Sequence, residues 1–255
     1  MKVVILAGGL GTRISEETQN KPKPMVNIGD KPILWHIMNI YSRQGYKDFI
    51  ICGGYKLNVI KNFFQQFDGN KIIFNYNGKK LSKKNSYKKS RNTWNVNLID
   101  TGLQTYTGGR LKRLEKILKN EQNFFFTYGD GLSNLNIKKL LKLHLKQKTI
   151  ATLTAVTPPS RFGVLKVKNN KVKKFLEKKD FEKDFLVNGG FFVFNQKIFN
   201  FLKNDNTILE QQPLEKLARI NQLSSYLHLG SWFSMDTQRD QVYLDKLYKD
   251  KKHFW

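Results

Sequence analysis

The sequence predicts an α/β protein built on a mostly parallel β-sheet flanked by helices, with a small antiparallel β extension. Three observations predict this fold. Short apolar runs alternate with helical patterns along the first half of the chain. A glycine-rich loop directly follows the first apolar run, and open α/β sheets bind ligands at the carboxyl ends of their strands. The length, 255 residues of which 40% are hydrophobic, suits a single domain over 1–255.

The first half of the chain alternates strands and helices. Val3–Leu6 is an apolar run of strand length that ends at a pair of glycines. Ile33 and Ile37 recur at helical spacing and Pro32 suits a first helical turn, which predicts a helix over 32–44. The other elements expected in this half are strands at 48–52, 72–76, 94–100 and 123–127, and helices at 60–67, 108–118 and 137–144.

Two stretches interrupt this alternation. Residues 77–93 are basic, polar and weakly periodic, so we expect a flexible excursion there. Residues 160–194 contain three short β segments, which predict the antiparallel extension. Those segments lie at 163–168, 171–176 and 186–194; a strand at 149–155, helices at 195–203 and 210–221, a strand at 223–229 and a helix from 238 complete the chain.

Composition restricts the classes of partner. The net charge of +25 attracts anions, but no zinc-finger or RNA-recognition pattern is present, so no specific nucleic-acid partner is expected. A solvated lysine surface is the simpler explanation of the charge. No run approaches the roughly 18 to 20 apolar residues of a membrane helix, and the start does not resemble a signal peptide. We therefore expect no membrane contact and a cytoplasmic location. The single cysteine, Cys52, excludes an internal disulfide.

Two short motifs predict an anion-binding site. Residues 6–13 read L-A-G-G-L-G-T-R, in which glycines let backbone N–H groups approach phosphate oxygens and Arg13 adds a forked donor. The glycine spacing matches neither the P-loop nor the dinucleotide fingerprint, and alone it is equally typical of a tight turn. Residues 21–25 read K-P-K-P-M, where prolines stiffen the backbone around two lysines. Alone, this second motif is more typical of an exposed basic turn.

Together the two motifs resemble the signature of sugar nucleotidyltransferases. Further segments resemble, in order, the glucose-1-phosphate cytidylyltransferases over nearly the whole chain: T-G-G-R at 107–110, T-Y-G-D-G at 127–131, P-P-S-R-F-G at 158–163, N-G-G-F-F at 188–192 and M-D-T-Q-R-D at 235–240. The resemblance implies a Rossmann-like, GT-A-like nucleotidyltransferase fold, Mg²⁺ as cofactor, and CTP and glucose 1-phosphate as substrates. It also implies CDP-glucose as product, for deoxysugars of surface polysaccharide, and a homo-oligomer.

The resemblance carries roles over to matching positions. The catalytic candidates are Arg13 and Lys23, and the metal candidates are Asp130 and Asp236, whose hard oxygens suit Mg²⁺. The nucleotide-binding candidates are Leu6, Ala7, Gly8, Gly9, Leu10, Gly11, Thr12, Arg13, Lys23, Thr107, Arg110 and Gly129. The sugar-phosphate candidates are Gly163, Glu177, Lys178, Asn188 and Gly189, within a sugar-binding extension at 160–194. The usual Glu-Lys-Pro is here Glu-Lys-Lys, which leaves the rigidity of that turn in question.

Three alternatives remain open at this point. The first is the same reaction with UTP or dTTP in place of CTP. The choice of base depends on loop geometry, which a sequence does not reveal. A sugar-transferring GT-A enzyme should carry Asp-x-Asp after a strand, whereas this chain carries Gly-Asp-Gly at 129–131. A non-catalytic basic protein that binds nucleotides or RNA should have lost Lys23, Asp130 or Asp236, and all three are present.

Overall fold

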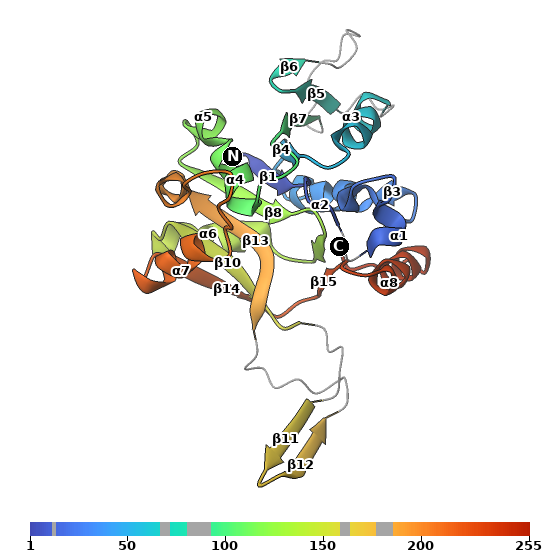
Figure 1. Ribbon diagram of the computed structural model, residues 1–255, viewed down its shortest axis with the longest axis vertical. Coiled ribbons are helices and arrows are strands. Elements are labelled where there is room, and N and C mark those ends of the chain that lie inside the picture. Colours follow the sequence, from blue (N-terminus) through green and yellow to red (C-terminus); the bar gives the residue numbers. More distant parts are fainter. Residues whose placement is uncertain (12–13, 67–71, 81–92, 159–163, 177–185) are drawn as a thin grey trace.

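The computed structural model describes residues 1–11, 14–66, 72–80, 93–158, 164–176 and 186–255. Its main sheet contains nine strands: β1 Val3–Leu6, β4 Asp48–Gly53, β5 Ile72–Tyr76, β6 Lys79–Lys80, β7 Trp94–Asp100, β8 Asn123–Tyr128, β10 Ala151–Val156, β13 Val187–Asn195 and β14 Leu223–His228. They lie in the order β14-β10-β13-β8-β1-β4-β7-β5-β6 (Figure 1). The mostly parallel α/β sheet that the sequence predicted is confirmed.

The sheet is parallel around β1 and antiparallel around β13. β1 pairs in parallel with β4 and β8, with Leu6 opposite Cys52 on one side and Tyr128 on the other. β13 runs against both of its neighbours, β8 and β10. We expected 186–194 within the antiparallel extension, but this segment is a central strand of the sheet. Its run of buried aromatic residues explains the position, because a strand covered on both faces is apolar throughout.

Alternating side chains of the strands fill two cores, one on each face of the sheet. In β1, Val3 and Ile5 join one core, whereas Val4 and Leu6 join the other. The first core is covered by α2 Ile33–Ser42, α3 Leu57–Gln66, α6 Ile137–Gln147 and α8 Gln238–Lys249. The second is covered by α4 Thr107–Lys112, α5 Glu115–Leu118, the 3₁₀ helix η3 Gln196–Phe201 and α7 Gln212–Arg219. Helices thus flank both faces, as the ribbon drawing shows (Figure 1).

The helix expected over 108–118 is divided in two. α4 ends at Lys112 and α5 begins at Glu115, and between them the Leu114 N–H donates to the Leu111 carbonyl over 2.9 Å. This i to i−3 bond tightens the turn and breaks the α-helical series. The apolar spacing was right, since Leu111, Leu114 and Leu118 are all buried.

Three two-stranded sheets stand outside the main sheet. β2 Asn27–Ile28 pairs with β3 Lys31–Pro32, and β9 Gly131–Ser133 pairs with β15 Trp232–Ser234. β11 Val164–Lys168 pairs with β12 Lys171–Leu176, and this hairpin lies apart from the sheet (Figure 1). It matches two of the three segments expected in the extension. Most of the excursion expected at 77–93 lies outside the described residues.

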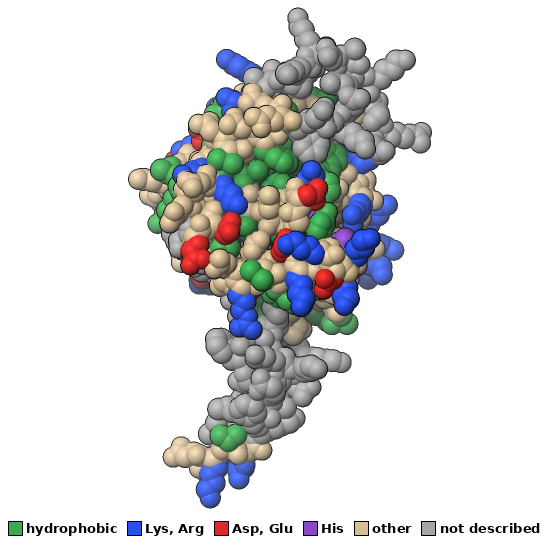
Figure 2. Space-filling view, turned by 90° about the vertical axis from the view of Figure 1, so that its right-hand side faces the viewer, with side chains coloured by type: hydrophobic (Ala, Val, Ile, Leu, Met, Phe, Trp, Pro, Cys, Tyr) green, Lys and Arg blue, Asp and Glu red, His purple; other side chains and the backbone are tan. Residues whose placement is uncertain are grey.

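The surface carries its positive charge in a dispersed form on the face drawn in Figure 2, where lysine and arginine side chains are interspersed with acidic ones. None of the helices in the described part of the chain has the length and apolar character that a membrane crossing requires.

Candidate active site

A pocket of about 560 Å³ opens where β1 and β8 end. Open α/β sheets bind ligands at this edge. The pocket wall gathers most of the predicted site residues: Leu6, Ala7, Gly8, Gly9, Gly11, Lys23, Thr107, Arg110, Gly129, Asp130, Asn188, Gly189 and Asp236. Leu10 is not among the lining residues and is 53% exposed. Thr12, Arg13, Gly163, Glu177 and Lys178 lie outside the described residues.

Close backbone packing forms the base of the pocket. A Cβ atom at Gly129 would lie 2.6 Å from the Leu6 carbonyl oxygen and 2.7 Å from Pro24 Cγ. Gly11 has a φ of +67°, a left-handed conformation that favours glycine. The glycines therefore let the end of β8, the glycine loop and the Lys-Pro motif approach one another closely.

Lys23 joins the two predicted metal ligands. Its Nζ atom lies 2.6 Å from Asp130 Oδ2 and 3.0 Å from Asp236 Oδ1. The Lys23 side chain is only 11% exposed, so these contacts are shielded from bulk water. Three segments separated by more than a hundred residues thus place one cation between two carboxylates.

Local pairing explains how Asp236 reaches Asp130. β15 pairs with β9 so that Ser234 lies opposite Gly131, and the Met235 N–H donates to the Asp130 carbonyl over 2.9 Å. Asp236 then precedes α8 without capping it. The cap is Thr237, whose side chain accepts from the Asp240 N–H, while the Asp240 carboxylate accepts from the Thr237 N–H. The Asp236 side chain consequently lines the pocket, where its carboxylate contacts Lys23.

The donor set at this point suits a hard divalent cation. The Lys23 ammonium already lies between the carboxylates of Asp130 and Asp236, where a positive charge is favourable. Mg²⁺ is commonly bound by one or two carboxylates, with substrate phosphates and water completing its octahedron. Within the described ranges, no group of three or more His, Cys, Asp or Glu side chains gathers as a metal cluster. Among the described residues, Asp130 and Asp236 are the carboxylates that contact Lys23 at this point.

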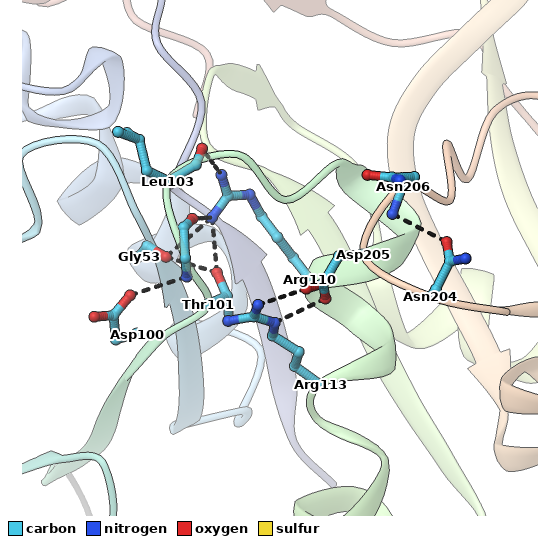
Figure 3. Close-up of polar contacts among 10 residues, drawn as sticks. Gly53, Asp100, Thr101, Leu103, Arg110, Arg113, Asn204, Asp205 and Asn206 are labelled. Carbon is cyan, nitrogen blue, oxygen red and sulfur yellow. Dashed lines mark hydrogen bonds and ion pairs between the residues drawn. The ribbon is translucent and has the colours of Figure 1, made fainter.

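Arg110 binds backbone carbonyls near the glycine loop, and Figure 3 draws its contacts with Gly53, Thr101 and Leu103. It is 4% exposed, and burial lowers the pKa of its guanidinium. A Cβ atom at Gly8 would lie only 2.2 Å from Arg110 Nη1, so the guanidinium occupies the space that this glycine leaves. The guanidinium donates over 2.7 to 3.2 Å to the Thr101 hydroxyl and the carbonyls of Gly8, Gly53, Gly102 and Leu103. It thereby connects the last residue of β4 to the segments that follow β1 and β7.

A neighbouring bond fixes α4 from its outer side. The Arg113 guanidinium forms a bidentate pair with the Asp205 carboxylate, at 2.8 and 2.6 Å (Figure 3). The Asp205 carbonyl also accepts from the Tyr106 N–H over 2.9 Å. α4, whose first turn carries Thr107 and Arg110, is therefore held at both of its ends.

Sequence reasoning missed an acidic part of the pocket wall. Glu210 accepts hydrogen bonds from the hydroxyls of Tyr128 and Thr107, the latter over 2.7 Å. Burial, followed by the adjacent Glu210 carboxylate, raises the pKa of Tyr128. Trp232 also lines the pocket, and its indole N–H donates to the Gly189 carbonyl over 2.7 Å. Glu210 lies in no recognisable motif, so only the position of its segment in the fold reveals it.

No histidine lines the pocket in the part of the chain that the structure describes. His144 is buried elsewhere, between Thr152 Oγ1 at 2.8 Å and Asn123 Oδ1 at 3.1 Å. A site without a histidine base suits chemistry in which the nucleophile is already ionised.

The glycine loop, Lys23 and the two aspartates at the carboxyl edge of the sheet suit an enzyme that binds phosphate groups together with a divalent cation. Residues 2–231 match the family model of nucleotidyl transferases, and the chain belongs to that family. Solved structures agree at the level of the fold. HddC from Yersinia pseudotuberculosis has a TM-score of 0.69 and 22% identity over 97% of this chain and 99% of its own. A UDP-glucose pyrophosphorylase has a TM-score of 0.69 and 19% identity over 98% of each chain.

Curated relatives indicate which group within this family the chain resembles. The glucose-1-phosphate cytidylyltransferase of Salmonella typhimurium is 48% identical over 257 residues, which cover 100% of this chain and 98% of that protein. The probable glucose-1-phosphate cytidylyltransferase of Bacillus subtilis is 38% identical over 100% of this chain and 99% of its own. Within its family the chain groups with the glucose-1-phosphate cytidylyltransferases, and the resemblance stated from the motifs is confirmed.

Proposed function

We propose that this enzyme transfers the cytidylyl group of CTP to α-D-glucose 1-phosphate, giving CDP-glucose and pyrophosphate. The observation that carries the proposal is the 48% identity, over the full chain, to a curated glucose-1-phosphate cytidylyltransferase. The pocket at the ends of β1 and β8 supports it, because it collects the motif residues of the nucleotide, the sugar and the metal.

The reaction needs no general base from the protein. A phosphate oxygen of glucose 1-phosphate, ionised at neutral pH, attacks the α-phosphorus of CTP. A new P–O bond forms while the bond to the β-phosphate breaks, and pyrophosphate leaves with that electron pair. The barrier arises chiefly from bringing two anions together and from charge in the transition state.

The charged cluster supplies the protein's part in this chemistry. Lys23 is the residue we infer to neutralise the α-phosphate, and Arg13 is inferred to bind the leaving phosphates. Asp130 and Asp236 would hold Mg²⁺, which when bound adds positive charge beside the phosphates. The backbone N–H groups of the glycine loop would orient the nucleotide, with Thr107 and Gly129 beside it.

The acceptor side of the proposal rests on Asn188 and Gly189, which line the pocket at the start of β13. Gly163, Glu177 and Lys178 would complete the sugar-phosphate site. We infer a single domain acting as a homo-oligomer in the cytoplasm, where CTP and hexose phosphates are made. CDP-glucose would then enter deoxysugar synthesis for surface polysaccharide such as the lipopolysaccharide O-antigen.

Pyrophosphate release tests the proposal directly. The enzyme is incubated with Mg²⁺, glucose 1-phosphate and, in parallel, CTP, UTP, dTTP, ATP or GTP. We expect release that is by far fastest with CTP. Faster release with another nucleotide would overturn the cytidylyl assignment and retain the reaction class. Omitting Mg²⁺ and adding a chelator should abolish release, and full activity under those conditions would refute the role of Asp130 and Asp236.

A further inference from the structure

Hydrogen bonds from two directions converge on one carboxylate in the pocket wall. The Leu209 N–H donates to Thr107 Oγ1 over 2.9 Å, and the Thr107 hydroxyl donates to Glu210 Oε2 over 2.7 Å. From the other direction, the Tyr128 hydroxyl donates to Glu210 Oε1. Glu210 thus joins a predicted nucleotide residue, Thr107, to Tyr128, and the predicted sugar residue Asn188 lines the same pocket.

The two hydrogen bonds to Glu210 determine which groups of the wall donate and which accept. An ionised carboxylate accepts hydrogen bonds and donates none, so both hydroxyl hydrogens, of Tyr128 and Thr107, are directed at Glu210. Each hydroxyl oxygen can then only accept from other groups. Glu210 lines the pocket and is exposed to it, so lone pairs on its two oxygens remain open to a ligand. The wall therefore presents acceptors to whatever lies against it.

Charge decides what kind of group can lie there. In the part of the chain that the structure describes, no lysine or arginine pairs with the Glu210 carboxylate. A phosphate would be repelled by this negative charge, and phosphates are attracted instead to Lys23 and to the metal site at Asp130 and Asp236. A neutral hydrogen-bond donor satisfies the carboxylate, and both proposed substrates carry such donors as hydroxyls on sugar rings.

We propose that Glu210 is a substrate-selecting residue that accepts a hydrogen bond from a sugar hydroxyl, on the hexose of the acceptor or the ribose of the nucleotide. This inference rests on the proposed function for the identity of both substrates. Tyr128 and Thr107 are positioning residues, because each holds one carboxylate oxygen in place. A hydrogen bond to a charged group discriminates strongly, because a substrate that lacks the hydroxyl leaves the carboxylate without its partner.

The test compares Glu210→Gln with Glu215→Gln. Glutamine keeps the shape of Glu210 but replaces one oxygen by an amide that donates, so one hydroxyl must turn its hydrogen toward the pocket. Glu215 lies on the same segment, in α7, where it forms an exposed ion pair with Arg219 at 3.6 Å and does not line the pocket. We expect Glu210→Gln to raise the KM of one substrate at least about tenfold, and Glu215→Gln to behave as wild type.

Deoxy substrates separate the two sources of the hydroxyl. If the ribose binds Glu210, the loss caused by Glu210→Gln disappears with 2′-deoxy-CTP or 3′-deoxy-CTP. If the hexose binds it, the loss disappears with one of the 2-, 3-, 4- or 6-deoxy analogues of glucose 1-phosphate. Tyr128→Phe and Thr107→Val, which each release one carboxylate oxygen, should show a smaller loss toward the same substrate. An equal loss with every analogue, or no loss at all, overturns the proposal.

Two controls keep this result independent of the proposed function. Wild-type pyrophosphate release identifies the true nucleotide, and the comparison is run with that nucleotide and its deoxy forms. If the wild type releases no pyrophosphate with any nucleotide, the proposed function fails. The role of Glu210 is then tested separately, by measuring dissociation constants for CTP, glucose 1-phosphate and their deoxy analogues. Unchanged dissociation constants in Glu210→Gln, or no binding to the wild type, overturn the inference. Circular dichroism verifies that each variant is folded.

Discussion

At the scale of single residues, the site depends on charges and donors that already have partners inside the protein. Lys23 lies between two carboxylates, and Arg110 is bound by backbone oxygens. A charge that is held in place needs little reorganisation when a substrate arrives, which is the basis of electrostatic preorganisation. Substitutions at these two residues should therefore affect different quantities, turnover for Lys23 and the stability of the loops for Arg110.

Replacing Lys23 by alanine should slow turnover about 100-fold or more, because one electrostatic contact to a transition state contributes roughly 3 to 4 kcal/mol. Lys21 provides the matched control within the same motif. It is partly exposed and pairs with Glu17 at 3.0 Å, and it does not line the pocket. Steady-state rates of pyrophosphate release for Lys23→Ala and Lys21→Ala measure the difference. Equal rates in the two variants would contradict the role assigned to Lys23.

Gly8→Ala should destabilise the fold, because the new Cβ would collide with the buried Arg110 guanidinium. We expect a loss of about 1 to 3 kcal/mol in the free energy of unfolding, the usual effect of overpacking. Gly9→Ala is the control, since a Cβ there meets nothing within 4 Å. Urea denaturation of both variants gives the comparison. If Gly8→Ala is as stable as Gly9→Ala, the Arg110 side chain can move away from the new Cβ without lowering the free energy of unfolding.

At the scale of helices and strands, short connections decide where the carboxylates lie. Asp236 is held by the pairing of β15 with β9 and by the cap of α8. The sequence predicted the beginning of α8 near residue 238, and the helix begins at Gln238. It did not predict β9 and β15, because three-residue strands have too few residues for an alternating pattern. The proximity of Asp130 and Asp236 came from the family resemblance alone.

Thr237→Ala should reduce both stability and activity. Loss of a helix cap costs about 1 kcal/mol, and here it also frees the backbone that carries Asp236. Asn136→Ala removes a comparable cap from α6, whose Lys139 N–H lies 2.9 Å from the Asn136 side chain. That variant should lose similar stability and keep wild-type turnover. Thermal unfolding and pyrophosphate release measure the two effects, and equal activity in both variants would contradict the link between the cap and the site.

At the scale of the whole molecule, the sequence predicted a sheet flanked by helices, but it did not predict the order of the strands in the middle of that sheet. Periodicity located the helices and the parallel strands, since each pattern is local. It could not show that β13 inserts between β8 and β10, because strand neighbours are set by pairing over long sequence separations. For the same reason Glu210 remained hidden, although Lys23, Asp130 and Asp236 were found by motif.

Acid should destabilise the whole fold through its buried histidines. Burial lowers the pKa of His144 to about 4 and also lowers the pKa of His36 and His228. Between pH 6.5 and 4 the unfolded chain binds protons that the folded chain does not, so stability falls as the pH falls through this range. His144 alone contributes up to about 3 kcal/mol of this loss.

Urea denaturation at pH 7.5 and pH 5 measures the acid effect, with His144→Gln as the comparison. This variant cannot titrate at position 144, so its stability should depend less on pH than that of the wild type. An identical pH dependence in the two proteins would exclude His144 as a source of the acid sensitivity.

The insertion of β13 has a consequence for biosynthesis. Both strands that flank it, β8 and β10, leave the ribosome before it does. Until residues 187–195 emerge, β8 lacks one neighbour, and β10 lacks both because β14 follows later still. The nascent chain therefore exposes unpaired strand edges on β8, which carries an aromatic run, and on β10. Unpaired edges of this kind promote association between chains. Translation that stalls before β13 should consequently yield an aggregating product, and efficient production should depend on uninterrupted synthesis or on chaperones that cover these edges.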